Sequence, residues 1–189
     1  MAPQKTSVTP LPGLKHLNNL QKSNRNLIIG IDPGLNGAVA IIDGDSGELV
    51  EVYDMPTFNT PSKSRKQGFL SHLDVHALSS FLDPWAPYVK FAVLEEPGAM
   101  PNQGLGSTFR FGHVCGAIHG VLAGHYMTVI PVKPGAWKLA MGLGAAKTAA
   151  REATDKIYPQ HKNLWKRVKD ADRSEAILLC QYGARFLTK

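Results

Sequence analysis

Residues 26–43 read NLIIGIDPGLNGAVAIID, two apolar runs separated by a turn. The first run is short, continuous and rich in β-branched residues, which is typical of a buried central strand. It delivers Asp32 directly into a Pro-Gly pair, and a second apolar run begins at Ala38. Turn chemistry alone explains a single Asp-Pro-Gly. The meaning of this carboxylate at the end of a buried strand therefore depends on the rest of the sequence.

The remaining pattern predicts an α/β fold. Five segments have the apolar runs of strands: 27–32, 38–43, 48–54, 89–96 and 126–132. The first three are separated by tight turns, which indicates antiparallel neighbours. Helical spacing is present over 71–82 and 106–124, and again in several segments towards the C-terminus. We therefore expect a five-stranded mixed sheet flanked by helices, with residues 57–68 forming a polar, mobile loop.

Composition favours a polyanionic partner. The 189 residues include 21 Lys and Arg against 15 Asp and Glu, a net charge of +6 with a pI near 9.4. Residues 1–26 are basic without any acid, so we expect a flexible basic tail ahead of one domain over 27–189. An organelle-targeting role for this tail remains open.

Membrane and metal–thiolate classes are disfavoured. No apolar stretch approaches the roughly 18–20 residues that span a bilayer. Cys115 and Cys180 have no paired spacing and no nearby His or Cys, which argues against a disulfide framework or a zinc site. We therefore expect a reducing compartment.

Cations gather in two further places. The segment 133–169 carries nine Lys and Arg but only two acids, and the polar segment 57–68 carries three cations and no acid. A solvated helical face would explain any one of these residues. Taken together, they predict contacts with a nucleic acid backbone, made by Lys63, Arg65, Lys66, Lys133, Lys138, Lys147 and Arg151.

Acids recur at positions where ligands bind in α/β sheets. A second strand ends on Glu95 and Glu96, again before Pro-Gly, and ligands bind outside the carboxyl ends of strands. Asp172 and Glu175 are three residues apart, which places both on one face of a helix expected from Ala176 onward. A capping box, with Asp172 as N-cap and Glu175 as its partner, also explains this spacing.

Several carboxylates without a His or Cys cluster are typical ligands of hard divalent cations. Mg²⁺ prefers oxygen ligands and takes further oxygens from phosphate. Two such ions about 3.5–4 Å apart activate water and stabilise the leaving oxygen in phosphodiester hydrolysis. Acids for metal and a basic surface for phosphate together predict a nuclease.

These motifs resemble those of the RuvC-type Holliday junction resolvases of the ribonuclease H-like superfamily, especially their bacteriophage branch. The similar segments are IGIDPGLNGAVAIID, AVLEEPGAMPNQGLGSTFRFG, the lysine-bearing VIPVKPGAWKLAMGLGAAKTAAREATDKIYP, and DRSEAILL. They cover residues 27–187 in the family's order. Bacterial members usually have Asp at the position of Glu175, so that position rests on the phage pattern.

The resemblance implies the fold, the activity and the site. The implied enzyme cuts four-way DNA junctions by paired symmetric nicks during recombination, repair or processing of branched DNA, and it leaves 5′-phosphate ends. Its catalytic acids, which would hold two Mg²⁺ ions or Mn²⁺ as a substitute, are Asp32, Glu95, Asp172 and Glu175. Lys147 would neutralise charge on the scissile phosphate, and Lys138 is a plausible second match for this lysine. The resemblance also implies a location in the cytoplasm of a bacterial or phage-infected cell. A two-fold symmetric junction implies a homodimer, and the helix over 106–124 is one candidate surface, although packing on its own sheet explains it equally well.

One departure and two rivals stay open. Bacterial members have an aromatic residue in the loop after the second acid, but PGAMPNQ has none. The nearest aromatics are Phe109 and Phe111, which we expect in the core. Another nuclease of this fold, an exonuclease or a transposase, shares the same acids. An actin-like or sugar-kinase-like ATPase opens with a similar Asp-x-Gly turn, but it normally needs two such domains.

Overall fold

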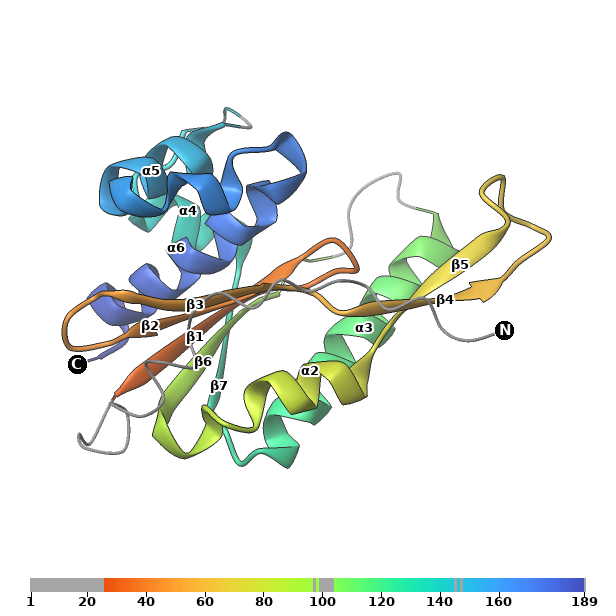
Figure 1. Ribbon diagram of the computed structural model, residues 1–189, viewed down its shortest axis with the longest axis horizontal. Helices are drawn as coiled ribbons and strands as arrows, with labels where there is room; N and C mark the ends of the chain where they lie inside the picture. Colours follow the sequence, from red (N-terminus) through yellow and green to blue (C-terminus); the bar gives the residue numbers. More distant parts are fainter. Residues whose placement is uncertain (1–25, 97, 99–103, 145, 147, 189) are drawn as a thin grey trace.

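The computed structural model describes residues 26–96, 98, 104–144, 146 and 148–188. Its main element is a five-stranded mixed sheet in the order β3-β2-β1-β6-β7 (Figure 1). The strands are β1 (Leu27–Asp32), β2 (Ala38–Asp43), β3 (Leu49–Asp54), β6 (Val89–Glu95) and β7 (Val129–Val132). Strands β1, β2 and β3 pair antiparallel, whereas β6 is parallel to β1 and to β7. This confirms the predicted α/β fold.

Helices cover both faces of this sheet (Figure 1). One layer contains α2 (Val75–Leu82) and α3 (Leu105–Gly124), and the other contains α4 (Pro134–Ala140), α5 (Ala149–Ile157) and α6 (Ala171–Phe186). Three short 3-10 segments complete the structure: η1 (Ala86–Tyr88), η2 (Pro159–Trp165) and η3 (Val168–Asp170). Over the described ranges, every helix is too short or too polar to cross a membrane.

The alternation of side chains along β1 divides the core into two layers. Its odd-numbered residues pack towards α2 and α3, while Ile28 packs towards α6. Gly30 lies on the same side as Ile28, and a Cβ there would collide with the backbone carbonyl of Ala176 in α6. The lack of a side chain at Gly30 thus lets α6 lie directly on β1. The same alternation points Asp32 towards α6.

The prediction of a mobile loop over residues 57–68 is wrong. A second, two-stranded antiparallel sheet consists of β4 (Thr57–Pro61) and β5 (Phe69–Leu73). Residues 62–68 form the turn between these strands, and the start of the expected 71–82 helix belongs to β5. This ribbon has almost no buried side, so its strands lack the apolar signal on which strand prediction depends. Helix α2 begins only after Asp74, whose side chain accepts from the Ala77 N–H.

Two other boundaries also differ from the prediction. Helix α6 begins at Ala171 rather than Ala176, because its first turn is polar and has no apolar periodicity to reveal it. Strand β7 is shorter than the expected 126–132, whereas α3 matches the predicted 106–124 closely. The earlier start of α6 matters for function, since it puts Asp172 inside the helix.

Candidate active site

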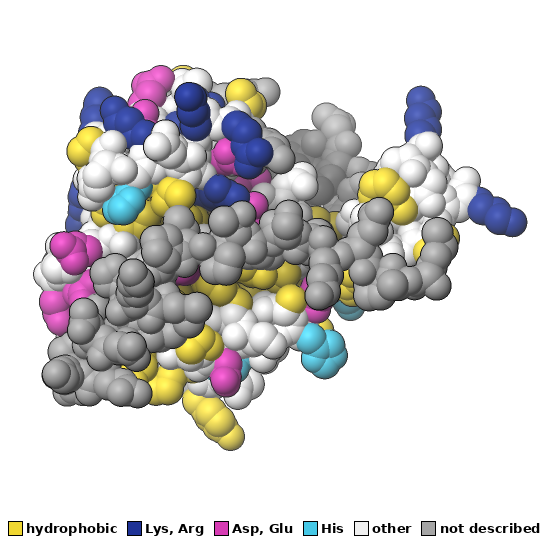
Figure 2. Space-filling view, in the orientation of Figure 1, with side chains coloured by type: hydrophobic (Ala, Val, Ile, Leu, Met, Phe, Trp, Pro, Cys, Tyr) yellow, Lys and Arg dark blue, Asp and Glu magenta, His cyan; other side chains and the backbone are white. Residues whose placement is uncertain are grey.

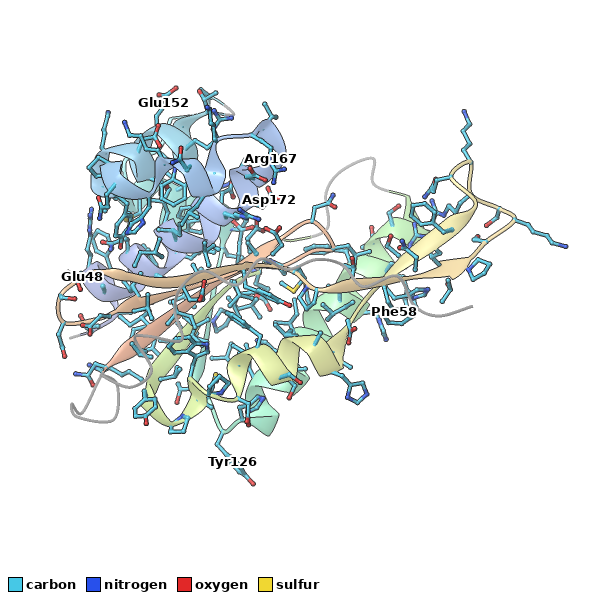
Figure 3. The ribbon with its side chains drawn as sticks, viewed as in Figure 1. Glu48, Phe58, Tyr126, Glu152, Arg167 and Asp172 are labelled. Atoms are coloured by element: carbon cyan, nitrogen blue, oxygen red, sulfur yellow. The ribbon has the colours of Figure 1, made fainter. Side chains whose placement is uncertain are left out.

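Acids from three elements meet at the carboxyl ends of the central strands. Asp32 ends β1, and Glu95 ends the adjacent parallel strand β6. Asp172 and Glu175 lie in the first turns of α6, which packs against β1 (Figure 3). Glu95 is on the same side of β6 as Phe91 and Val93, both of which pack in the layer beneath α6. These four side chains therefore share one side of the sheet.

Burial and neighbouring negative charge act together on Asp32, Glu95 and Asp172. Burial raises the pKa of Asp32 well above its usual range, and the negative charges of Glu95, Glu175 and Asp172 raise it further. Burial, followed by neighbouring acids, also raises the pKa of Glu95 and that of Asp172. The positive charge of Lys138 lowers the pKa of all three groups in part. The site is a desolvated concentration of negative charge.

Helix α4 holds two of these acids with consecutive residues. The indole Nε1 of Trp137, a fully buried side chain, donates to Glu95 Oε1 at 2.8 Å. The Lys138 ammonium lies 2.8 Å from Glu175 Oε2. Neighbouring residues on a helix are about 100° apart, so one short helix reaches two different carboxylates. Sequence reasoning named Lys138 as a DNA contact and as a second match, after Lys147, for the family's lysine, and it missed Trp137.

Glu96 is separated from this cluster by strand alternation. It pairs with Lys133, with Glu96 Oε2 and Lys133 Nζ 3.0 Å apart. Both residues line a cavity of about 460 Å³ between the sheet and α3. Glu95 also borders this cavity, whereas Asp172 borders a second one, of about 370 Å³. The carboxylate cluster thus has an open space on each side.

Arginine ion pairs fix the start of α6. Arg173 joins Asp54 at the end of β3, with Nε–Oδ1 and Nη2–Oδ2 distances of 2.5 and 2.6 Å. Arg167 binds Asp170 through both carboxylate oxygens, and this contact lowers the pKa of Asp170. Asp170, not Asp172, is the N-cap residue of α6, so the capping interpretation of Asp172 is wrong. Asp172 instead lies in the first turn of the helix, where its charge acts on Asp32.

The turn after Asp32 is built for close contact with the strand end. A Cβ at Gly37 would collide with the backbone carbonyl oxygen of Asp32, so only glycine fits there. Gly34 has a φ of +132°, a conformation that favours glycine. The two glycines after the Asp-Pro therefore shape the turn that frames the carboxylate.

The donor set fits a divalent cation. As the side chains stand, the described ranges contain no group of three or more His, Cys, Asp or Glu arranged to hold a metal ion. Lys138 lies among the acids and neutralises Glu175 instead. All four acids nevertheless offer hard oxygen ligands, and a bound cation would offset the burial and the repulsion that together raise the pKa of Asp32. Metal binding would require Glu175 to exchange its contact with Lys138.

The predicted DNA-contacting cations lie in separate places. Lys133 and Lys138 are at the site, where both are ion-paired, and Arg151 is on α5. The three cations of the 57–68 segment, Lys63, Arg65 and Lys66, lie in the turn between β4 and β5. Lys147 lies outside the described residues, as do the loop residues 99–103 and the proposed tail over 1–25.

The two candidate aromatics differ. Phe109 is 77% exposed on α3, so the prediction of a core position is wrong for this residue. Phe111 is half-buried, lines the 460 Å³ cavity with Glu95, and lies near Gly34. Helical rotation explains the difference, because residues two apart on a helix point about 200° apart.

Comparisons with known proteins identify the fold. No protein-family model and no curated protein sequence matches the chain. Among solved structures, it is similar to T. thermophilus RuvC in complex with Holliday junction substrate, with a TM-score of 0.53 and 19% identity over 85% of this chain and 95% of that chain. A second Thermus thermophilus RuvC structure has a TM-score of 0.50 and 16% identity, over 86% and 97% of the two chains. A Fowlpox virus resolvase with substrate Holliday junction DNA matches at a TM-score of 0.45 and 14% identity, over 86% and 99%. The chain has the ribonuclease H-like fold of RuvC.

Proposed function

We propose that this chain is a metal-dependent endonuclease that resolves four-way DNA junctions by paired symmetric nicks. The observation that carries the proposal is the gathering of Asp32, Glu95, Asp172 and Glu175 on one side of a RuvC-like sheet. Resolution of junctions is favoured over other nuclease activities of this fold by the phage-resolvase form of the four sequence motifs. The solved structures similar to this chain include a RuvC bound to a Holliday junction.

The four acids would hold two Mg²⁺ ions, or Mn²⁺ in their place. The bound cations would activate water and neutralise charge on the scissile phosphate. Trp137 keeps Glu95 oriented, and Arg173 anchors the start of α6 so that Asp172 and Glu175 stay beside Asp32. Lys147 is proposed to face the scissile phosphate. The products would carry 5′-phosphate ends.

The enzyme would act as a homodimer, because two symmetric cuts need two active sites. Helix α3 offers a suitable surface. Leu105 and Phe109 are 90% and 77% exposed on it, and Gly112, Gly116 and Gly120 follow on the same face. Gly112 and Gly116 also line the rim of the 460 Å³ cavity that Glu95 borders, so this face runs up to the candidate site. A Cβ at any of these three glycines would meet open space. Each costs the helix about 1 kcal/mol relative to Ala without a packing benefit in the described chain.

This face is complementary to itself. If two α3 helices cross antiparallel near residues 112–116, the large side chains of Leu105 and Phe109 lie opposite the glycine-rich half of the second copy. Leu105 and Phe109 of each copy would then fill the space above the glycines of the other copy. The same contact would occur twice, as a two-fold axis requires. We therefore assign the exposed face of α3 to the dimer interface.

A cleavage assay tests the proposal. The four-way junction is compared with linear duplex, single-stranded DNA and an RNA–DNA hybrid, each with and without Mg²⁺. We expect paired nicks at symmetric positions in the junction alone, and only with the metal. Equal cutting of linear duplex or hybrid would indicate another nuclease of this fold, and an absence of Mg²⁺-dependent cutting would refute the enzyme.

A further inference from the structure

The β4–β5 hairpin projects from the body of the protein without a core of its own. Figure 1 shows it extending away from the five-stranded sheet, with its turn at the far end. Leu73, at its base, is the single buried residue of the two strands. Two-stranded hairpins are marginally stable in water when nothing packs against them. The hairpin therefore contributes little to the stability of the fold, and we look for a functional role.

The hairpin is nevertheless well ordered by its own contacts. The Ser71 hydroxyl donates to Asn59 Oδ1 at 2.7 Å, and Thr60 Oγ1 lies 2.8 Å from a ring nitrogen of His72. His72 also stacks on Phe58, which is labelled in Figure 3. At the tip, the Ser62 N–H donates to the Gly68 carbonyl. The ribbon therefore holds its tip in a defined position rather than as a loose loop.

The charge on this ribbon has one sign. From Met55 to Leu73 there is no Asp or Glu, while the turn carries Lys63, Arg65 and Lys66. Lys63 and Lys66 are exposed, and none of the three forms an ion pair within the described residues. Figure 2 shows cationic side chains at this end of the molecule, apart from the cations near α4 and α5. Cations without an acidic partner, carried at the end of a two-stranded hairpin, are suited to bind a polyanion.

We infer that the β4–β5 hairpin is a DNA arm that contacts the phosphates of a duplex branch beside the crossover. This inference rests on the proposed function for the identity of the nucleic acid. The width of a two-stranded ribbon fits a duplex groove, and the three cations at the turn reach the phosphates on either side of it. Phosphate contacts position a protein without reading sequence, which suits an enzyme that selects a branched shape.

Salt-dependent binding tests the arm. Each phosphate contact contributes about 0.9 to the slope of log affinity against log salt, so the triple variant Lys63→Gln, Arg65→Gln, Lys66→Gln should lower the slope by about 2.7. The single variant Lys90→Gln serves as the control for net charge. It removes an exposed charge near the start of β6, at the end of this strand away from Glu95. Binding is measured without divalent metal, so that no cleavage occurs. The double variant Lys63→Arg, Lys66→Arg should retain the slope of the wild-type chain.

Arm length gives a second, independent readout. Shortening the junction branches should weaken binding by the wild-type chain but have little effect on the triple variant, since that variant has already lost the outer contacts. A slope reduction per charge equal to that of Lys90→Gln, or equal sensitivity to arm length, would overturn the DNA arm. Loss of binding to RNA or anionic vesicles without any loss on DNA would also overturn it. Hairpin-dependent duplex binding in a chain that cuts no junction would refute the proposed function and leave the arm standing.

Discussion

Replacing Trp137 by Phe should weaken metal binding far more than a matched change elsewhere. The indole N–H of Trp137 donates to Glu95 Oε1 at 2.8 Å, and Glu95 is only 7% exposed. The chain provides its own control. Trp165 is also buried, packs in the same layer, and donates to Asp155 Oδ1 at the same distance of 2.8 Å, but Asp155 lies outside the carboxylate cluster.

The magnitudes follow from these contacts. Either Trp→Phe change removes packed atoms, which costs about 1–2 kcal/mol of stability. Trp137→Phe also leaves a buried carboxylate oxygen without its donor, about 1.5–3 kcal/mol more. Asp155 is only half-buried, so water can replace the lost donor there. An energy of 1.5–3 kcal/mol corresponds to roughly 10–150-fold in an equilibrium constant, and loss of a group that orients a metal ligand typically costs 10–100-fold.

Two measurements separate positioning from stability. Thermal unfolding with increasing Mn²⁺ or Mg²⁺ reports metal binding without catalysis, and junction cleavage with increasing Mg²⁺ reports the active enzyme. We expect Trp137→Phe to need 10–100-fold more metal in both assays, while Trp165→Phe needs about the same amount as wild type. If the two variants respond identically to metal, Trp137 supports only the core and the reasoning fails.

Three further predictions concern the acids and helix α3. Asp32→Asn should reduce Mg²⁺-dependent cleavage by about a thousandfold or more, because several kcal/mol of transition-state stabilisation are lost, yet junction binding in EDTA should persist; near-wild-type cutting would remove Asp32 from the site. Because the folded chain holds the Asp32 proton to higher pH than the unfolded chain, metal-free stability should fall as pH rises through the folded pKa. Denaturation at a series of pH values should show this fall shrink in Asp32→Asn. The double variant Gly116→Gln, Gly120→Gln should be a monomer by analytical ultracentrifugation, although both changes raise helix propensity. The control Gly106→Gln, at the edge of the exposed face of α3, should remain dimeric. A double variant that still dimerises would place the interface elsewhere.

The sheet was predictable because its strands are buried. Residues 27–32 and 38–43 are continuous apolar runs bounded by turns, and both are almost entirely buried. The same rule failed for the β4–β5 hairpin, whose paired strands carry Asn, Thr, Ser and His at exposed or partly exposed positions. A pattern method sees burial, not backbone pairing, so an exposed ribbon has the composition of a loop.

The candidate acids could be found from sequence, but the residues that orient them could not. Asp32 and Glu95 stand at strand ends, where a carboxylate is conspicuous. Trp137 looks like an ordinary core residue in a short helix, and its role depends on which acid the α4 helix happens to face. Arg173 likewise acts through Asp54, 119 residues away in the sequence. Such long-range pairs leave no local periodicity.

The stretch around Asp32 couples fold and site through side-chain alternation. Three alternate residues of β1 lie on its α6 side: Ile28, Gly30 and Asp32. Ile28 packs in the core, Gly30 lies against the backbone of α6, and Asp32 supplies the carboxylate. Any side chain at position 30 would push against the backbone of Ala176, one residue after Glu175. The helix would then move away from β1 at the point where its acids approach Asp32. The closeness that concentrates charge at this site is thus set by a glycine two residues before the acid, within the strand that also organises the sheet.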